Sequence, residues 1–279
     1  MTSPSSQPQT WRVIYSPPAP GAWNMAVDEA ILEGIAKGKS PPTLRLYAWD
    51  PPCLSLGYAQ PVSDVDLQAL KSHGWHLVRR PTGGRAILHT DELTYSIIGR
   101  QDDPRLAGSV VESYQRLSLA LLQALQSLGI PATAEANPAL PTGSDPKGPV
   151  CFEVPSTYEI TINHKKIIGS AQARRKGMVL QHGSFPLQGD LRRITTALNF
   201  QDEAQRLRAA QRVQVRAATA EEILGVAPTW EMTAAAFASA FEQVLSLDVT
   251  QESLNDYETE IANRLVEEKY NHPAWTSKV

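Results

Sequence analysis

Apolar residues recur at helical spacing in several parts of the chain. A run at four-residue intervals, with Asn24 before it as the N-cap, predicts a helix over residues 21–39. The clearest helix begins at Ser109, because Glu112 three residues later completes a capping box ahead of a long apolar stripe. Shorter helices are predicted over residues 61–74 and 191–200, and from about residue 219 onward the pattern predicts helices only.

Short apolar or alternating runs bounded by Gly, Pro, Asn or Asp are typical of strands. They cover residues 43–49, 53–58, 76–80, 86–88, 93–98, 158–163, 167–169 and 179–185. The strands come in groups rather than in strict alternation with helices. The predicted fold class is therefore α+β: a mixed, mainly antiparallel sheet flanked by helices, with a helical C-terminal part.

The length of 279 residues allows one large domain with a small appendage. Residues 1–10 are polar and rich in Ser, Pro and Gln, so we expect a disordered N-terminal tail. We expect residues 11–227 to form the main domain, residues 228–279 a helical segment, and the Pro- and Gly-rich residues 137–149 a mobile loop.

Composition excludes several function classes. The formal net charge is −3, so no overall positive field favours nucleic acid. No apolar run approaches the length of a membrane span, about 18 residues. Two cysteines give neither a disulfide framework nor a metal-binding set, which favours a reducing, cytoplasmic compartment.

The segment Arg79-Arg80-Pro81-Thr82-Gly83-Gly84-Arg85 is the first candidate for chemistry. Paired glycines allow positive φ and close approach of backbone to a ligand, and guanidinium groups suit phosphate or carboxylate. The alternative is a hairpin turn with solvated charges. His89 follows at the end of a strand and is either an acid–base group or a structural hydrogen-bonding group.

Cys151 is the sharper candidate. It stands directly after the Pro- and Gly-rich loop, and the lysine pair Lys165-Lys166 follows fifteen residues later in the printed sequence. A neighbouring cation favours thiolate over thiol and so activates a cysteine as a nucleophile. The alternatives are a buried hydrophobic cysteine, which is our expectation for Cys53, and an exposed strand lysine for Lys166.

Small and polar residues interrupt two of the predicted strands. Gly169, Ser170 and Ala171 end the strand that Lys166 begins, and small residues make room for a ligand chain or a close backbone crossing. Gln181-His182-Gly183-Ser184 forms a polar cluster inside an apolar strand, which is typical of a site or a bulge.

Four ordered segments together resemble the superfamily of lipoate–protein ligases, octanoyltransferases and biotin ligases. They are Asn24-Met25-Ala26-Val27-Asp28-Glu29; Arg80-Pro81-Thr82-Gly83-Gly84-Arg85-Ala86 with His89; Lys166-Ile167-Ile168-Gly169-Ser170-Ala171-Gln172; and Leu180-Gln181-His182-Gly183-Ser184. Within that superfamily, Cys151-Phe152-Glu153-Val154-Pro155-Ser156 resembles the cysteine segment of the octanoyltransferases found in Gram-positive and some other bacteria.

The resemblance implies an octanoyltransferase of lipoate biosynthesis that needs no cofactor and no metal. It implies that Cys151 accepts the acyl group and that Lys166 is the active-site lysine. The remaining residues of the motifs would line the acyl site: Arg80, Thr82, Gly83, Gly84, Arg85, His89, Gly169, Ser170, Ala171, His182 and Gly183.

The implied donor is octanoyl-acyl carrier protein. The implied acceptors are lipoyl domains, namely the glycine-cleavage H protein and the E2 subunits of 2-oxoacid dehydrogenases. Because an acyl carrier protein is acidic, we expect a local basic patch, with Arg174-Arg175-Lys176 and Arg192-Arg193 as candidates.

Three other functions fit part of the pattern. An ATP-dependent lipoate–protein ligase shares the lysine motif but has no use for a thiol nucleophile, and Arg85 replaces a third glycine of many such ligases. An amidotransferase would move octanoyl between lipoyl domains through the same cysteine. A non-catalytic acyl- or lipoyl-domain-binding protein would need neither Cys151 nor Lys166.

Overall fold

A computed structural model describes residues 10–136, residue 150 and residues 158–279 of the chain. In this part of the chain eight strands form one sheet in the order β11-β1-β2-β6-β10-β9-β8-β7, and a second sheet has the order β4-β3-β5. The strands are β1 (Thr10–Tyr15), β2 (Thr43–Tyr47), β3 (Cys53–Leu56), β4 (His76–Arg79), β5 (Ile87–His89), β6 (Glu92–Arg100), β7 (Thr133–Ala136), β8 (Tyr158–Ile162), β9 (Lys165–Arg175), β10 (Met178–Pro186) and β11 (Asp248–Gln251).

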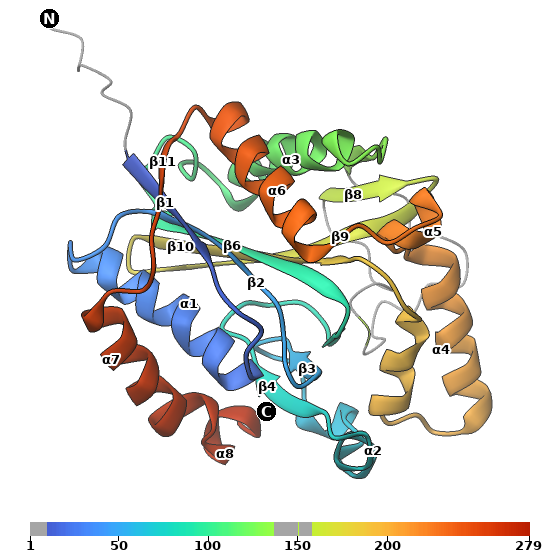
Figure 1. Cartoon of the computed structure of the whole chain (residues 1–279). Coiled ribbons are helices and arrows are strands. Elements are labelled where there is room, and N and C mark those ends of the chain that lie inside the picture. Colours follow the sequence, from blue (N-terminus) through green and yellow to red (C-terminus); the bar gives the residue numbers. More distant parts are fainter. Residues whose placement is uncertain (1–9, 137–149, 151–157) are drawn as a thin grey trace, which may run out of the picture.

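Helices cover both faces of the large sheet (Figure 1). They are α1 (Gly21–Ala36), η1 (Val62–Asp64), α2 (Leu67–His73), α3 (Val110–Ser127), η3 (Leu191–Ala197), α4 (Glu203–Arg216), α5 (Ala220–Leu224), α6 (Trp230–Leu245), α7 (Asp256–Leu265), η4 (Val266–Tyr270) and α8 (Pro273–Thr276). The fold class is thus confirmed as a mixed, mainly antiparallel α+β sheet with a helical C-terminal part.

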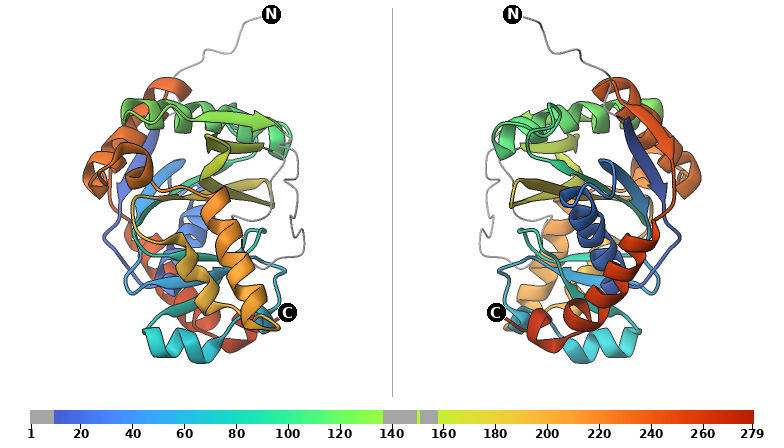
Figure 2. Two further views of the ribbon diagram at one scale, coloured as in Figure 1. Left: turned by 90° about the vertical axis from the view of Figure 1, so that its right-hand side faces the viewer. Right: turned by 90° about the vertical axis from the view of Figure 1, so that its left-hand side faces the viewer.

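Among the described residues, three apolar cores lie between these layers. One lies between the sheet and α3 with α6, and a second lies between the opposite face and α1 with α7. Figure 2 shows the sheet between these two helical layers from both sides. The third core joins the small sheet to η3 and α4. Strand β10 is buried along its whole length because both faces of the sheet are covered at that point.

The capping box at the start of α3 is confirmed. The Ser109 hydroxyl accepts a hydrogen bond from the Glu112 backbone N–H, and the Glu112 carboxylate accepts one from the Ser109 N–H. The Asn24 N-cap, in contrast, is wrong. The N-cap of α1 is Pro20, and Asn24 lies inside the helix, where its side-chain amide donates to the carbonyl oxygens of Ala19 and Ala48.

One alternative and one further expectation need correction. Strands β4 and β5 do not form a hairpin around the Gly-Gly turn, because β3 lies between them. The C-terminal part is not exclusively helical, since β11 adds a parallel edge strand to β1. The expected division into residues 11–227 and 228–279 stays a prediction. Residues 1–9 and 137–149 lie outside the described residues, and Thr10, counted with the tail, begins β1.

A buried ion pair ties the C-terminal helices to the sheet. The Arg12 guanidinium of β1 binds the Glu258 carboxylate of α7, and neither side chain is more than 1% exposed. Ser40 also donates to Glu258 at 2.7 Å. Because each charge loses its hydration shell, each depends on the other for compensation.

Replacing one partner of this pair should therefore destabilise the whole fold. We expect Arg12→Met to lower the free energy of unfolding by about 3–5 kcal/mol, measured by urea denaturation. The matched control is Arg206→Met, which removes the exposed ion pair with Glu203 on α4 and should cost less than about 1 kcal/mol. Equal effects of the two variants would contradict this account.

Candidate active site

A mainly apolar pocket lies where the middle of β9 and β10 meets the Gly-Gly loop. The space between its atoms amounts to about 390 Å³, part of which is open to solvent. Eight residues that the sequence motifs single out line it: Arg80, Gly84, His89, Gly169, Ser170, Ala171, His182 and Gly183. Ser184, the last residue of the 180–184 motif, also lines it, and four residues come from positions without a motif: Tyr47, Trp49, Ile87 and Thr94. We call this cavity the acyl pocket, after the role that the family resemblance implies for its residues.

The small residues of the motifs meet across two neighbouring strands. Gly183 of β10 stands opposite Ser170 of β9 on one side and Tyr95 of β6 on the other. A Cβ on Gly183 would lie 2.5 Å from Tyr95 Cε1 and 2.7 Å from Ser170 Oγ. Glycine is therefore required here by packing, and it lets the Tyr95 hydroxyl reach Ser170 Oγ at 2.8 Å.

The Gly-Gly loop is held from within by Arg80. This guanidinium is only 3% exposed and donates to the carbonyl oxygens of Gly83 and Arg85, both at 3.0 Å. It also donates to the Ser55 hydroxyl and carbonyl oxygen. Arg80 is therefore neither a solvated charge on a hairpin nor a guanidinium open to an anion, because its hydrogen bonds are made to the protein. A Cβ on Gly57 would overlap the carbonyl oxygen of Gly84, so Gly57 lets the loop pack against the chain after β3.

His89 belongs to a buried hydrogen-bond network at one wall of the pocket. Its Nδ1 lies 2.7 Å from Glu92 Oε1 and its Nε2 lies 2.7 Å from Ser55 Oγ. The Trp49 ring stacks on His89 with 3.9 Å between ring centroids, and Trp49 donates to Thr94 Oγ1. Burial acts to raise the pKa of Glu92, but His89 and hydrogen bonds outweigh burial and lower it.

His182 and Asp28 form a second buried pair below the pocket. Thr82 Oγ1 lies 2.6 Å from His182 Nε2, and His182 Nδ1 faces Asp28 Oδ2 at 3.7 Å. Burial lowers the pKa of His182, and Asp28 offsets only part of that effect, so the ring is neutral near pH 7. Burial acts to raise the pKa of Asp28, but Arg45 and His182 outweigh it and lower the pKa.

Lys166 is buried rather than exposed on its strand. It is 5% exposed, and its Nζ lies 2.8 Å from Glu159 Oε1 on the neighbouring strand β8. Glu159 was not predicted, because no motif in the sequence marks it. Cation and carboxylate compensate each other in a place where an unpaired charge would be costly.

Cys151 lies outside the described residues, so its contacts stay a prediction. Its neighbour in the sequence, Val150, is fully buried and forms a backbone bridge with Ala86, directly after the Gly-Gly loop. Cys53 is buried in β3, where burial raises the pKa of the thiol, with Glu92 adding to the effect. Cys53 is thus an inert core residue, as its strand position predicted.

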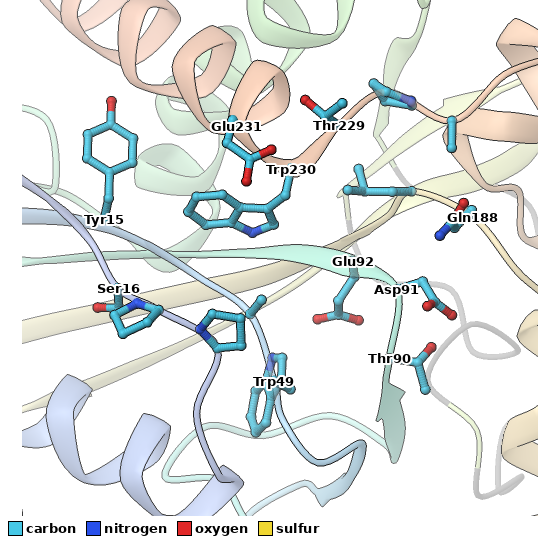
Figure 3. A pocket seen from close by; sticks show the side chains of 16 residues that line it. Tyr15, Ser16, Trp49, Thr90, Asp91, Glu92, Gln188, Thr229, Trp230 and Glu231 are labelled. Atoms are coloured by element: carbon cyan, nitrogen blue, oxygen red, sulfur yellow. The ribbon is translucent and has the colours of Figure 1, made fainter.

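Two other cavities adjoin the acyl pocket. One is a surface cleft that Gly83 and Arg85 line and that shares Gly84 with the pocket. Thr82 lines neither space, but its hydroxyl contacts His182 of the pocket. A larger, open cavity lies beyond Trp49, which lines both spaces; it amounts to about 1310 Å³ including space open to solvent. Figure 3 shows Trp49 on one side of this larger cavity and Trp230, from the start of α6, on the other.

Within residues 10–136, 150 and 158–279, no group of three or more His, Cys, Asp or Glu side chains is placed to hold a metal ion. No helix in the same ranges combines the length and apolar character needed to cross a bilayer.

Comparison with known proteins assigns the chain to a family. Residues 20–242 match the lipoyl protein ligase A/B catalytic domain. The octanoyltransferase LipM of Symbiobacterium thermophilum is 39% identical over 271 residues, covering 96% of this chain and 98% of that protein. LipM of Geobacillus kaustophilus is 38% identical, with 97% and 99% covered.

The chain belongs to the octanoyltransferases of the lipoyl protein ligase A/B family.

Solved structures of the same family share the fold. A bipartite lipoate protein ligase from Thermoplasma acidophilum, described together with its E2 lipoyl domain, superposes with a TM-score of 0.79 at 26% identity and 96% coverage of both chains. A lipoate-protein ligase A bound with ATP gives 0.77 at 25% identity, with 96% of this chain and 98% of that chain covered. The family resemblance read from the four motifs is thereby confirmed.

The crowding around Gly183 leads to a stability prediction. We expect Gly183→Ala to lower the free energy of unfolding by about 1–3 kcal/mol, because Tyr95 and Ser170 must move to admit the methyl group. Gly83→Ala is the matched control, since a Cβ there meets no atom within 4 Å. Urea denaturation of both variants measures the difference, and a neutral Gly183→Ala would refute the packing argument.

The buried titratable groups predict that acid weakens the fold. The pKa values of His182, Glu92 and Asp28 are all lowered in the folded state, so the unfolded chain takes up protons first as the pH falls. Stability should be fully present above pH 6.5, the ordinary pKa of histidine, and should decrease progressively below it. The measurement is the urea midpoint from pH 8 to about pH 4.

The control for this pH dependence is His182→Gln, which removes the titrating ring. The slope between pH 6.5 and about pH 5 should become shallower, while the loss caused by the two carboxylates at lower pH remains. An unchanged slope in that interval would rule out His182 as its source.

Proposed function

We propose that the enzyme moves octanoyl from a carrier-protein thioester to Cys151 and then to a lysine of a lipoyl domain. The observation that carries the proposal is the acyl pocket, an apolar cavity bordered by the Gly-Gly loop and by the small residues of β9 and β10. Membership of the octanoyltransferases supports the acyl group. The lipoyl acceptor is supported by the related ligase that is described with its E2 lipoyl domain.

The pocket offers an environment that suits a fatty chain. Each methylene taken out of water contributes about 0.8 kcal/mol, so an octanoyl chain gains several kcal/mol from an apolar cavity of this kind. The carbonyl end would lie toward the loop, where Val150 pairs with Ala86 one residue before Cys151. This neighbourhood supports Cys151 as the residue that receives the chain.

The proposed reaction consists of two acyl transfers. In the first, the Cys151 sulfur attacks the thioester carbonyl, the new C–S bond replaces the old one, and the carrier thiol leaves with the proton. In the second, the acceptor amine attacks the Cys151 thioester, an amide forms, and the amine proton returns to the sulfur. The first step exchanges one thioester for another, and the second lowers the free energy by converting a thioester into an amide. ATP is therefore not required.

Lys166 is proposed as the cation that favours the Cys151 thiolate. A free cysteine has a pKa of about 8.5, so only a small fraction is thiolate near pH 7 without such help. The Glu159–Lys166 pair fixes the ammonium group on β9 rather than leaving it to move in solvent. Glu159 is thus a positioning residue in this proposal.

A single mass measurement tests the thioester. Mixing the enzyme with octanoyl-acyl carrier protein should add the mass of one octanoyl group, and the addition should disappear in Cys151→Ala. Cys53→Ala is the matched control and should still be acylated, because burial keeps the Cys53 thiol protonated. An apo lipoyl domain should then discharge the adduct.

Two results would overturn the proposal. One is octanoyl transfer by Cys151→Ala at the wild-type rate. The other is transfer that requires free octanoate and ATP, which would make the protein a lipoate ligase of the kind that its fold also serves.

The wall between the two cavities predicts chain-length selectivity. Trp49→Ala should join the acyl pocket to the larger cavity and raise the rate ratio of dodecanoyl to octanoyl donors by about tenfold or more, given the free energy of burying further methylenes. Trp230→Ala enlarges the far side and leaves the wall intact, so its ratio should stay at the wild-type value. Competition between the two thioesters, followed by intact mass, measures the ratio.

A further inference from the structure

A polar surface cleft opens from the mouth of the acyl pocket, and the reaction proposed above gives it no role. It amounts to about 900 Å³, including space open to solvent, and shares Gly84 with the pocket. Its lining comes from the chain after β3, the Gly-Gly loop and the end of β9: Tyr58, Ala59, Gln60, Pro81, Gly83, Gly84, Arg85, Gln172, Ala173, Arg174 and Arg175.

Two cations meet over one ring at this cleft. Lys278 Nζ lies 3.1 Å from the Tyr58 ring centroid and 3.8 Å from that of Trp275, while the Arg175 guanidinium lies 4.9 Å from the Tyr58 centroid. A hydrogen bond with Arg175 does most to lower the pKa of the Tyr58 hydroxyl, and the charge of Lys278 lowers it further. Their positive field therefore reaches the Tyr58 hydroxyl at the cleft.

The cation pair has no anionic partner in the described part of the chain. No carboxylate there lies within ion-pair distance of Arg175 or Lys278, and no acceptor completes a hydrogen bond to Lys278 Nζ. Burial lowers the pKa of Lys278, and the Tyr58 hydroxyl offsets only part of that effect. Such a pair is suited to an anion supplied by a ligand.

Hydrogen bonds fix the C-terminal segment so that Lys278 lies against Tyr58 at the cleft. The buried Arg79 guanidinium donates twice to the Thr276 carbonyl oxygen, at 2.7 and 3.0 Å, and Trp275 Nε1 donates to the Arg79 carbonyl oxygen at 2.9 Å. The Val62 N–H donates to the Val279 carbonyl oxygen at 3.0 Å. These bonds hold the chain on both sides of Lys278 beside β4 and η1, as Figure 1 shows for the C-terminal end.

Of the other basic candidates in the sequence, Lys176 is exposed and does not line the cleft, and the three arginines are already engaged by the protein. Arg192 pairs with Asp190, and Arg193 pairs with Asp91. Arg174 donates to the carbonyl oxygens of Leu106, Gly108 and Ser109, so it serves to hold the start of α3. Two cations therefore remain for an anion to compensate. Arg175 lines the cleft, and Lys278 Nζ lies buried against the Tyr58 and Trp275 rings without a hydrogen-bond acceptor.

We propose that Arg175 and Lys278 bind the phosphate of the phosphopantetheine arm that carries the acyl thioester, while the arm passes Gly84 into the acyl pocket. The proposal rests on the thioester donor of the proposed function. Ala171 at the pocket and Arg175 at the cleft are four residues apart on β9, which corresponds to about 13 Å along a strand. An extended arm can therefore place its phosphate at the cleft and its thioester at the acyl pocket.

The test compares two donor fragments that differ only in the phosphate. Calorimetry should show that the wild-type protein binds phosphopantetheine more tightly than pantetheine. Lys278→Met should reduce this preference by about tenfold, and the more exposed Arg175→Ala by a few-fold. Arg192→Ala is the matched control and should keep the full preference, because its charge is paired with Asp190 on another surface.

Equal binding of the two fragments by the wild type, or equal losses in all three variants, would overturn the proposal. Tighter binding of ATP than of phosphopantetheine, dependent on Lys278, would assign the cleft to a nucleotide and overturn it as well. Acylation by octanoyl-phosphopantetheine is followed separately by intact mass. If the binding preference holds and no acyl-enzyme forms, the cleft assignment stands and the Cys151 route fails.

Discussion

The Asp28 carboxylate is the point on which the site depends. It is fully buried in α1 and accepts hydrogen bonds from Arg45 at 2.8 Å, Ser96 at 2.9 Å and Tyr47 at 3.1 Å. His182 faces it from β10. Since an unpaired carboxylate cannot be left in such a place, the helix and three strands of the sheet can meet in only one arrangement. Tyr47 and His182, both held by this group, form part of the acyl pocket.

Polar and apolar parts of the molecule have separate tasks. The apolar layers around α3 with α6 and around α1 with α7 fix the sheet, whose central strand β10 is buried throughout. Buried hydrogen bonds then set individual side chains: Glu92 holds His89, and Glu159 holds Lys166. Satisfied polar networks of this kind specify one arrangement where apolar packing alone would allow several.

Much of the fold was readable from local pattern. The stripe and capping box of α3 and the central strands follow from periodicity, because their residues face a core on a fixed spacing. Helix α4 was missed because only Ala209 and Val213 are buried on it, too few for a stripe. Strand β11 was missed because its four residues are partly or fully exposed and do not alternate. Both depend on tertiary packing.

The motifs predicted which residues would line one cavity, but not which hydrogen bonds and ion pairs each residue would form. Gly169–Ala171 and Gly183 do meet at one cavity, since their strands pair in register. The partners of the titratable residues escaped prediction. Asp28 reaches His182 across 154 positions of sequence, and Glu159 carries no signal that distinguishes it from a surface glutamate. Such long-range pairs are set by strand order, which a single sequence does not display.

The internal bonds of Arg80 have a consequence for how tightly the enzyme can hold its donor. The Gly-Gly loop separates the acyl pocket from the surface cleft, and its carbonyl oxygens are fixed by a buried guanidinium and by contact with Gly57. Its conformational entropy is therefore lost when the chain folds, not when the ligand arrives. A donor that enters between pocket and cleft meets a preorganised entrance, and more of its contact free energy is retained as affinity.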